Sequence, residues 1–441
     1  MLFIPSRRGF LKSAAAVAAL PAWFIDMERA EAAPEQPKSP NEKPNIGLIG
    51  CGGQGRGDAK AASNFGNVVA VCDVDAGRAE QTAASFKGAK AYADFRKLLE
   101  RNDVQVIVNG TPDHWHTLVN LAALKAGKDV YSEKPLTLTI DEGKRLVAAV
   151  RDSKRILQTG SQQRSDARFR LACELVRNGR LGKLSRITVV LPAGLHGGPF
   201  KTAAVPAGLD WDFWQGQTPA VDYVPQRCHF SFRYWYDYSG GTMTDWGAHH
   251  NDIALWGLGL ERSGPVSVEG KALVEPVPGG YTAASEYDVT YTYADGVVHR
   301  CISTTVNKWD GLLLRQPKTG ELPHGVKFEG ADGWIFVTRG KIEASRPDII
   351  STPLERKTVT LPVSSNHMAN FFDCVKSRKP PICDAEIGHR SASICHLGVI
   401  AIRLGRKLTW DPEKEQFTDD KEANGLVARE MRKKWGYEMV G

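Results

Sequence analysis

A glycine-rich turn near the start of the chain constrains the fold more than any other feature. Gly50, Gly52 and Gly55 have the GxGxxG spacing, and the turn follows the short apolar run 45–49. A helical stretch runs on to about Asn64. In a dinucleotide-binding fold, these glycines allow a tight turn, a close approach of the pyrophosphate and packing of the helix on the strand. The helix N-terminus then offers free N–H groups to the phosphates.

An acidic residue follows the next apolar run at the distance that this motif expects. Asp73 closes the run 68–72, where a carboxylate accepts hydrogen bonds from the adenosine ribose hydroxyls. It would repel a 2′-phosphate, so NAD is favoured as the cofactor over NADP, although Arg56 and Arg78 keep NADP open. The cofactor-binding residues predicted from this region are Gly50, Gly52, Gly53, Gln54, Gly55 and Asp73.

Strands and helices alternate through the first third of the chain. Further strands are predicted at 104–108, 129–131 and 156–158. The helices are predicted at 76–86, 114–126 and 139–153. Short β-branched runs separated by helices indicate a parallel sheet with right-handed crossovers. We therefore predict an α/β Rossmann domain over residues 44–163.

After about residue 160 the pattern changes to strands joined without regular helices. Six are predicted, with hairpin-like turns between several of them, at 185–191, 266–273, 284–293, 297–303, 325–328 and 333–337. Helices at 366–377 and 385–405 and a short strand at 407–410 follow. We predict an α+β domain over residues 164–441 with one large, mostly antiparallel open sheet. Such a sheet commonly seals its edges by forming a homodimer or homotetramer.

The first residues have the pattern of an export signal. Arg7 and Arg8 precede the apolar run 14–25, and residues 30–32 offer a small-x-small cleavage site. We predict a twin-arginine (Tat) signal peptide over residues 1–32, outside the fold, and a linker over 33–43. The protein would then be periplasmic or otherwise exported, with the Tat machinery as a partner. An uncleaved membrane anchor is the alternative, but the apolar run is short for a span.

Composition argues against several other classes of protein. The formal charge is +7 over 441 residues, without a basic block, so no nucleic-acid partner is predicted. The eight cysteines are scattered without a CxxC pair, so a disulfide-held scaffold is not predicted. One bridge in the C-terminal half stays open. No stable membrane insertion is predicted after cleavage of the signal.

Three further segments carry a family resemblance. They are residues 109–116 (NGTPDHWH), residues 127–135 (GKDVYSEKP) and residues 240–252 (GGTMTDWGAHHND). Together with the glycine turn, they resemble the Gfo/Idh/MocA family, named for glucose–fructose oxidoreductase and inositol dehydrogenase, over about residues 45–417. The resemblance implies a Rossmann domain followed by a sheet domain that carries subunit contacts, with the substrate between them.

The resemblance also implies site residues. Lys134 of the Glu-Lys-Pro motif would lie beside the nicotinamide and the substrate hydroxyl, and Asp245 and His249 match the family's Asp-x-x-x-His motif. On a helix that spacing puts both side chains on one face, where the carboxylate could orient the imidazole. The other candidates are Thr111, Pro112, His116 and Glu133 along the cofactor, and Gln163 and Arg164 at the substrate.

These residues could oxidise a secondary alcohol. A neutral His249 can take the hydroxyl proton, and a cationic Lys134 stabilises the developing alkoxide, while the hydride goes to the nicotinamide. We predict an NAD(P)-dependent oxidoreductase acting on a carbohydrate or polyol. His249, His250 and Asp252, with Asp245, also hint at metal-ligand spacing. No cysteine or third well-placed ligand accompanies them, so no metal is predicted.

Export bears on how the cofactor would be used. Outside the cytoplasm there is no reliable pool of free NAD, so we expect the cofactor to be held tightly and restored in each cycle. Coupled oxidation and reduction of two sugars does this. The alternative is an NAD-dependent glycoside hydrolase that works by transient oxidation and elimination, with His249 or a tyrosine as base. A third reading is a non-catalytic sugar-binding protein on a Rossmann shell, against which the joint presence of Lys134, Asp245 and His249 argues.

An aromatic stretch and two arginines lie upstream of the last motif. The rings between residues 211 and 238 could stack on a sugar, and core or subunit packing is an equal alternative. Arg227 and Arg233 could meet an acidic or hydroxyl-rich substrate, or form ion pairs at an interface.

Overall fold

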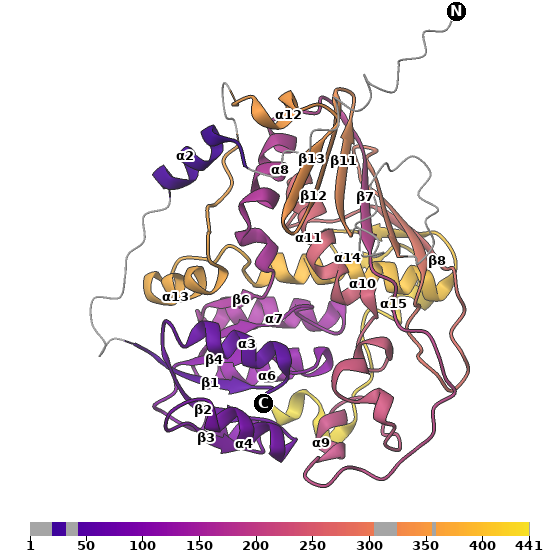
Figure 1. The fold of residues 1–441 in the computed structure, drawn as a ribbon. Coiled ribbons are helices and arrows are strands. Elements are labelled where there is room, and N and C mark those ends of the chain that lie inside the picture. Colours follow the sequence, from indigo (N-terminus) through magenta and orange to yellow (C-terminus); the bar gives the residue numbers. More distant parts are fainter. Residues whose placement is uncertain (1–19, 32–42, 304–323, 355–358, 441) are drawn as a thin grey trace, which may run out of the picture.

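The computed structural model describes residues 20–31, 43–303, 324–354 and 359–440. Two sheets organise it, one in each half of the chain, and the longest helix lies between them (Figure 1).

The first sheet is the parallel sheet that the sequence predicts. Its six strands have the spatial order β3-β2-β1-β4-β5-β6. They are β1 (Asn45–Ile49), β2 (Asn67–Cys72), β3 (Lys90–Tyr92), β4 (Val106–Asn109), β5 (Asp129–Ser132) and β6 (Leu157–Thr159). The strand order reverses between β1 and β4, and in such sheets ligands bind beyond the carboxyl ends of the strands at this point.

Helices connect these strands. They are α3 (Gly53–Ala62), α4 (Ala76–Ala84), α5 (Phe95–Leu99), α6 (Asp113–Lys125) and α7 (Ile140–Ser153). Local signals set their ends: the Thr139 side chain caps α7 by accepting from the backbone of Glu142, and Gly127 follows α6 with φ +74°. The sequence did not predict β3 or α5, which are the short edge strand and a helix of five residues.

The second sheet has nine strands in the order β13-β12-β11-β7-β10-β9-β8-β14-β15. The strands are β7 (Leu184–Leu191), β8 (Ser267–Ala272), β9 (Tyr287–Thr292), β10 (Val298–Ser303), β11 (Gly325–Gly330), β12 (Gly333–Thr338), β13 (Lys341–Ala344), β14 (Leu408–Asp411) and β15 (Gln416–Phe417). Only β7 and β10 pair in parallel. The predicted α+β domain with a mostly antiparallel sheet is therefore confirmed.

Helices accompany this sheet. The two predicted at 366–377 and 385–405 are confirmed, but helices also precede them, contrary to the expectation that the strands there are joined without regular helices. The longer ones are α8 (Ala167–Arg177), α11 (Gly247–Leu258), α13 (His367–Ser377) and α14 (Ala385–Leu404). The short ones are α9 (Trp211–Gln215), α10 (Thr242–Asp245), α12 (Asp348–Ser351) and α15 (Lys421–Asn424). Helix α14 packs against both β8 and α7, so it joins the two halves of the molecule. Helix α11 is buried on nearly all sides, so its sequence lacks the amphipathic pattern that predicts a surface helix.

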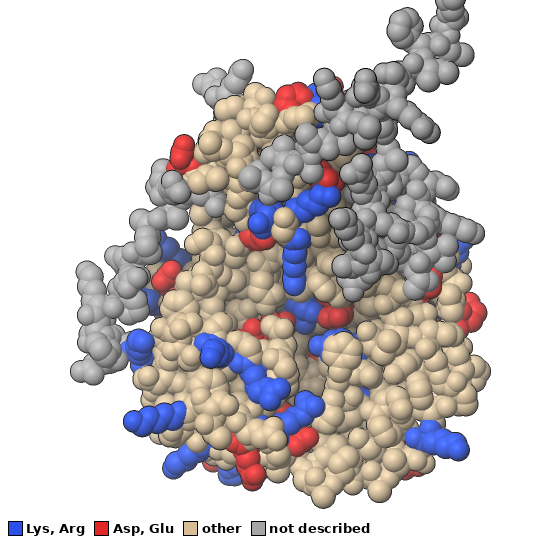
Figure 2. Space-filling model, viewed as in Figure 1, with Lys and Arg blue, Asp and Glu red and all other residues tan. Residues whose placement is uncertain are grey.

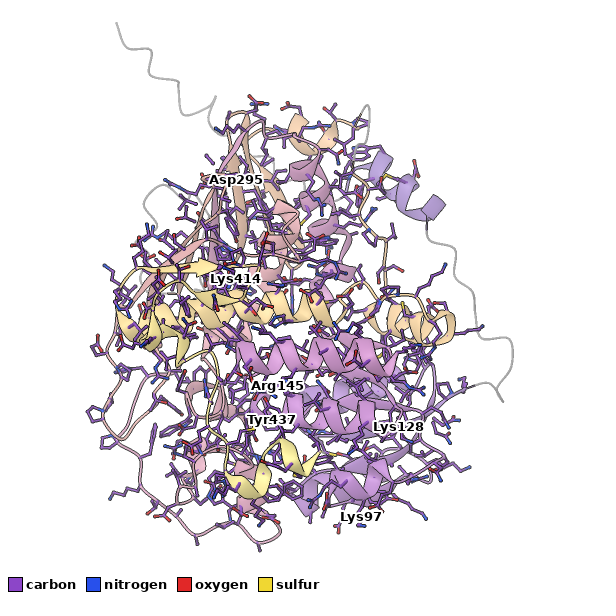
Figure 3. All side chains as sticks on the ribbon, turned by 180° about the vertical axis from the view of Figure 1, so that it is seen from behind. Lys97, Lys128, Arg145, Asp295, Lys414 and Tyr437 are labelled. Atoms are coloured by element: carbon purple, nitrogen blue, oxygen red, sulfur yellow. The ribbon has the colours of Figure 1, made fainter. Side chains whose placement is uncertain are left out.

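The C-terminal segment returns to the Rossmann half. Trp435 stacks on Phe213 and meets Trp115 edge-on, with ring centroids 4.5 and 5.9 Å apart. The Arg145 guanidinium lies 4.6 Å from the Tyr437 ring centroid, and Figure 3 shows both residues on the rear face. This return fastens the region around α9 to the Rossmann domain.

A helix before the Rossmann domain is also part of the packed structure. Helix α2 (Ala22–Glu31) lies within the predicted signal peptide. Phe24 is fully buried in the core of the sheet domain, 4.6 Å from the Arg170 guanidinium. The expectation that the N-terminus lies outside the fold therefore needs correction for this helix, while residues 1–19 and the linker at 33–42 lie outside the described residues. No helix in the described part of the chain is long and apolar enough to cross a bilayer.

All eight cysteines are buried free thiols. The bridge that the sequence left open in the C-terminal half does not form between any of them in this structure.

Candidate active site

A cavity of about 810 Å³ lies between the two domains at the carboxyl ends of the parallel strands. Figure 2 shows it as a hollow at the centre of one face, with acidic and basic side chains gathered inside. One end is lined by the glycine turn and Asp73, the other by Lys134, Asp245 and His249. Its size suits a cofactor and a small substrate.

The glycine turn has the geometry that a dinucleotide requires. Gly50 has φ +91°, and a Cβ atom there would lie 2.5 Å from the backbone of Gly110. A Cβ on Gly55 would lie 2.0 Å from the Gly50 carbonyl oxygen, which explains the close helix packing. Gly53 faces open space, and no side chain caps α3 at Gly52. The first N–H groups of α3 are therefore left for an anionic ligand.

Asp73 stands directly after β2 at the same end of the cavity. Its Oδ2 accepts from the backbone N–H of Cys51 at 2.7 Å, and its Oδ1 accepts from that of Asp75 at 2.9 Å. Burial raises the pKa of Asp73, and these two hydrogen bonds oppose that shift. Because each oxygen keeps a further lone pair, the carboxylate can still accept from ribose hydroxyls.

Part of the sheet domain lies over this end of the cavity. In this covering segment, residues 206–230, the Gly208 carbonyl accepts from Ala76 N at 2.9 Å. The N–H of Asp210 donates to the Val74 carbonyl at 3.0 Å. His229, which also lines the cavity, places its Nε2 3.7 Å from Asp75 Oδ2. Both domains therefore enclose the site where an adenosine would bind.

The structure places nearly all the predicted cofactor residues on the cavity wall. The exception is Gly55, which is buried beneath the turn. Thr111 and His116 hold the middle of the wall together: His116 Nδ1 lies 2.7 Å from the Pro135 carbonyl and Nε2 lies 2.9 Å from that of Thr111. Pro112 precedes α6 and lines the same wall.

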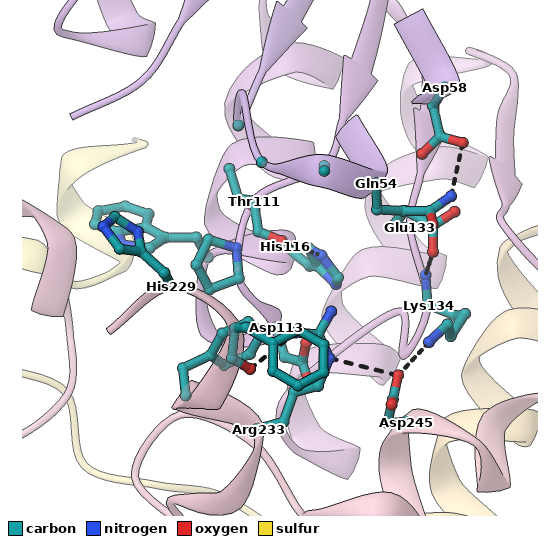
Figure 4. A pocket seen from close by; sticks show the side chains of 18 of the residues that line it. Gln54, Asp58, Thr111, Asp113, His116, Glu133, Lys134, His229, Arg233 and Asp245 are labelled. Carbon is teal, nitrogen blue, oxygen red and sulfur yellow. Dashed lines mark hydrogen bonds and ion pairs between the residues drawn. The ribbon is translucent and has the colours of Figure 1, made fainter. Parts of the chain in front are cut away.

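Glu133 belongs to a buried pair of carboxyl groups that sequence reasoning missed. Burial raises the pKa of both Glu133 and Asp58, and the nearby Glu133 carboxyl raises the pKa of Asp58 further. Gln54 donates to Asp58 at 3.0 Å (Figure 4). Gln162 donates to Glu133 at 2.8 Å. The spacing of Gln54 and Asp58 on one helix was the available signal.

Lys134 and Asp245 meet across the domain boundary. Lys134 Nζ lies 2.5 Å from Asp245 Oδ1, and Arg233 Nε lies 3.6 Å from the same oxygen (Figure 4). Burial alone would raise the pKa of Asp245, but the two cations lower it below its usual value. The carboxylate is thus charged, and it positions both cations at the cavity wall.

His249 lies next to this pair and is neutral. Burial, with the charges of Lys134 and Arg339, lowers its pKa well below the usual value. Its Nδ1 has no hydrogen-bond partner among the described residues. The expected contact with Asp245 is not among the hydrogen bonds of the described chain: Asp245 ends α10, Trp246 separates the helices, and the carboxylate turns to Lys134 instead.

Two predicted substrate residues lie elsewhere. Arg164 is 2% exposed and forms two hydrogen bonds to Asp252, at 2.7 and 2.8 Å. Gln163 is equally buried, and neither residue lines the cavity, whereas their neighbour Gln162 does. This corrects the expectation for Gln163 and Arg164. The Arg164–Asp252 pair fixes the turn after β6 to α11, the helix that carries His249.

Several further residues line the cavity. Asp113 and Trp246 belong to two of the family motifs, and Phe230 and Tyr234 belong to the aromatic stretch, whereas Arg339 had no signal in the sequence. Arg233 lines the cavity, in line with the prediction that it could meet the substrate. Arg227 instead pairs with Asp237 at 2.8 Å. Arg339 lies in the turn between β12 and β13, whose sequence carries no motif.

The metal-ligand spacing in the last motif does not become a cluster. Asp252 is paired with Arg164, and His250 Nε2 lies 2.8 Å from His324 Nδ1. Within the described ranges no group of three or more His, Cys, Asp or Glu side chains could hold a metal ion.

Two family models match the chain. One is described as "Oxidoreductase family, NAD-binding Rossmann fold" and covers residues 44–161. The other is described as "Oxidoreductase family, C-terminal alpha/beta domain" and covers residues 193–437. Both carry the designation GFO_IDH_MocA.

Curated relatives match part of the chain. Inositol 2-dehydrogenase 2 of Saccharopolyspora erythraea is 34% identical over 143 residues, 32% of this chain and 42% of that protein. Inositol 2-dehydrogenase of Salmonella typhimurium is 31% identical over 165 residues, 36% of this chain and 47% of that protein. The chain thus spans less than half the length of these relatives.

Solved structures match over most of the chain. The WlbA dehydrogenase of Bordetella pertussis, in complex with NADH and UDP-GlcNAcA, gives a TM-score of 0.62 at 19% identity, covering 84% of this chain and 99% of that one. Levoglucosan dehydrogenase, in complex with NADH and levoglucosan, gives 0.61 at 17% identity, covering 83% and 99%. These matches establish a shared fold.

Proposed function

The chain belongs to the Gfo/Idh/MocA oxidoreductase family, and from this premise we propose that it oxidises a secondary hydroxyl of a sugar or polyol with NAD. One observation carries the proposal: Lys134, Asp245 and His249 lie together at the end of the cavity opposite Asp73. A dinucleotide anchored at the glycine turn and Asp73 would extend along the cavity toward them. The names of the inositol and sugar dehydrogenases among the relatives support the substrate class.

The cavity residues divide the work of alcohol oxidation. Bound NAD would supply the acceptor for the hydride. Lys134 offers a cation to the oxygen as it loses its proton, which stabilises developing negative charge. His249 is neutral because burial and nearby cations lower its pKa, so a ring nitrogen is free to accept the proton, although the same shift makes it a weaker base. Asp245 holds Lys134 in place through the 2.5 Å ion pair.

Tyr234 also lines the cavity, and it suits the role of base less well. Burial and the nearby Asp245 carboxylate raise the pKa of its hydroxyl. A phenol with a raised pKa keeps its proton, so it can donate a hydrogen bond to substrate but is a poor acceptor. This difference favours His249 as the base.

We further propose that the cofactor is NAD rather than NADP and that it is held tightly. The Asp73 carboxylate at the ribose position supports NAD, since it would repel a 2′-phosphate. The covering segment supports retention, because contacts such as that of the Asp210 N–H with the Val74 carbonyl hold it over the adenosine end of the cavity.

Export by the twin-arginine route stays a proposal that rests on Arg7, Arg8 and the apolar run after them. The packing of Phe24 bears on where processing would occur, since cleavage after residue 32 would remove a buried side chain. An oligomeric state is likewise proposed from the extent of the nine-stranded sheet.

Retention of the cofactor also suits a second function, NAD-dependent glycoside cleavage. Transient oxidation to a ketone would acidify the neighbouring C–H, and elimination would expel the aglycone as its alcohol. Water would then add to the resulting double bond, and return of the hydride would restore the hydroxyl. The same observation, the covering segment over the adenosine end, favours any chemistry that restores its cofactor in place.

One experiment tests the proposal and separates the two functions. Protein purified at full length is assayed for bound NAD by mass, then offered free sugars and aryl glycosides without added cofactor. Formation of bound NADH from a free sugar supports oxidation, whereas release of the aryl group without net NADH supports glycoside cleavage. Protein that binds no dinucleotide contradicts both.

A further inference from the structure

Arg339 is a cation of the cavity without a carboxylate partner in the described chain. It lies in the turn between β12 and β13 and lines the cavity together with Trp246 and His249. Its guanidinium lies 4.9 Å from the Trp246 ring centroid. The acids Glu133, Asp166 and Asp245 attract it only at longer range, and no hydrogen bond or ion pair joins it to a described residue.

The nearest carboxylate is already occupied. Asp245 pairs with Lys134 at 2.5 Å and with Arg233 at 3.6 Å, and its pKa is lowered by both. Lys134 and Arg233 already share the single carboxylate of Asp245, and Arg339 adds a third cation near them. The substrate end of the cavity carries an excess of positive charge.

The remaining acids of the cavity have partners of their own. Glu133 accepts a hydrogen bond from Gln162 at 2.8 Å, and it lies near Asp58, whose pKa it raises. Asp113 accepts from Ser239 Oγ at 2.5 Å, and burial raises its pKa. None of them lies within ion-pair distance of Arg339, so the excess charge stays uncompensated within the described residues.

Arg339 is exposed and lies on the cavity wall, so its guanidinium can pair with an anionic group of a bound ligand. Arginine presents planar donors that match a carboxylate or a phosphate in pairs, and it cannot lose its charge. A neutral sugar gains no ion pair from such a residue. In addition, the charge of Arg339 lowers the pKa of His249 and so weakens it as a base. A bound anion beside Arg339 would offset that charge and raise the pKa of His249 again.

We propose that the substrate is an acidic carbohydrate whose carboxylate or phosphate group pairs with Arg339 while the hydroxyl to be oxidised lies at Lys134 and His249. The inference rests on the proposed function and names the substrate class for it. Phe230, which is exposed at the cavity wall, offers a ring face for the C–H groups of the sugar. The anionic group takes no part in the redox step: the hydride leaves carbon for NAD, and the proton leaves oxygen for His249.

The test uses matched sugars and the full-length, NAD-loaded protein. Glucose, glucuronate and glucose 6-phosphate share one ring and differ at one position, and the galactose and mannose sets extend the panel. Calorimetry gives the affinity of each, and NADH formation gives turnover. We expect at least one acid to bind roughly tenfold to hundredfold more tightly than its neutral counterpart, the usual range for a charge-assisted pair.

The variant Arg339→Gln should abolish this preference, and Arg339→Lys should keep part of it, since it retains the charge without the fork. The matched control is Arg346→Gln, which removes a charge from the same region where the side chain is 56% exposed and pairs with Asp348. It should leave the preference intact.

The outcomes separate the two claims. Preference for the uronate or for the sugar phosphate identifies the source of the anion, and each supports the site. If no acid binds more tightly than its neutral counterpart, or if Arg339→Gln keeps the preference, the inference fails while NADH formation from a neutral sugar would still support oxidation. If acids bind through Arg339 but no sugar yields NADH, the anion site stands and the proposed oxidation fails.

Discussion

Lys134 Nζ lies 2.5 Å from Asp245 Oδ1, and this ion pair connects the turn after β5 of the Rossmann domain to helix α10 of the sheet domain. The two side chains are 13% and 19% exposed, so they face the cavity from otherwise buried positions. A single contact thus brings a charged group from one domain to the site where the other presents His249.

Loss of the lysine charge should affect the reaction more than the cofactor. In Lys134→Met we expect turnover to fall by about 10²–10⁴-fold, the range for one acid–base or electrostatic group. The Kd for NAD should change little, because the glycine turn and Asp73 are untouched. Steady-state rates and NAD titrations check this. Lys97→Met, at an exposed lysine paired with Glu100, is the control; full turnover in Lys134→Met would remove the lysine from the mechanism.

Asp73 should govern the choice between NAD and NADP. In Asp73→Asn the side chain keeps an oxygen acceptor but loses its charge, so the repulsion of a 2′-phosphate disappears. We expect the ratio of the two Kd values to shift toward NADP by roughly tenfold or more. Equilibrium titration with each cofactor measures it, with the exposed Asp103→Asn as control. An unchanged ratio would assign the discrimination to Arg78 or another group.

The covering segment should control release of the cofactor. His229 has φ +54°, a conformation that glycine adopts without strain, so His229→Gly removes the imidazole near Asp75 without a backbone cost. We expect faster NAD release in stopped-flow displacement and an unchanged or higher Tm. Lys154→Gly, at an exposed helix end with φ +54°, offers the same backbone change away from the cavity. Equal release rates in both variants would count against the covering role.

Helix α2 should stabilise the full-length protein. Phe24 is fully buried, and Phe→Ala in a core typically costs about 3–5 kcal/mol. We expect Phe24→Ala to lower the free energy of unfolding by about that amount, measured by urea denaturation. Asp26→Ala, on the exposed face of the same helix, should have little effect. If Phe24→Ala is as stable as the parent, α2 does not dock in solution.

Glu142 should make stability depend on pH. It is 2% exposed, and burial raises its pKa to about 7, although Leu138 N and Thr117 Oγ1 donate to it. Because the folded state holds the proton more tightly, this group stabilises the fold below its unfolded pKa, and that stability is lost as pH rises toward about 7. The loss amounts to about 3 kcal/mol.

The variant Glu142→Gln keeps an acceptor oxygen and cannot titrate. Relative to the parent, it should therefore be about equally stable near pH 4 and more stable near pH 8. Urea denaturation across this range, with the exposed Glu100→Gln as control, measures the difference. A parent and variant with parallel pH profiles would show that Glu142 titrates normally.

Local signals made most of the fold predictable. The parallel strands are short β-branched runs with helices between them, and α7 and α14 have side-chain caps or a terminal glycine that mark their ends. The sequence patterns did not predict helix α11, because burial on nearly all sides removes the amphipathic pattern. They did not predict α5, because five residues give too little periodicity. Tertiary contacts, rather than local preference, stabilise both.

The site was predictable where residues share a motif. Lys134, Asp245 and His249 could be named because each lies in a recognisable segment. Their pairing could not, since only the tertiary structure brings Lys134 beside Asp245, whose carboxylate pairs with the lysine instead of with His249. The sequence could not predict Arg339 as a site residue, because only the packing of β12 and β13 brings the turn between them to the cavity.

The central claim is that this cavity oxidises a sugar or polyol hydroxyl with bound NAD through Lys134 and His249. The most direct test is a single-turnover experiment in which NAD-loaded protein is mixed with the sugar panel and the absorbance of reduced nicotinamide is followed. We predict a stoichiometric rise for at least one sugar, slowed by about 10²-fold or more in Lys134→Met and in His249→Ala. No rise with any sugar, or an equal rise in the parent and both variants, would contradict the account.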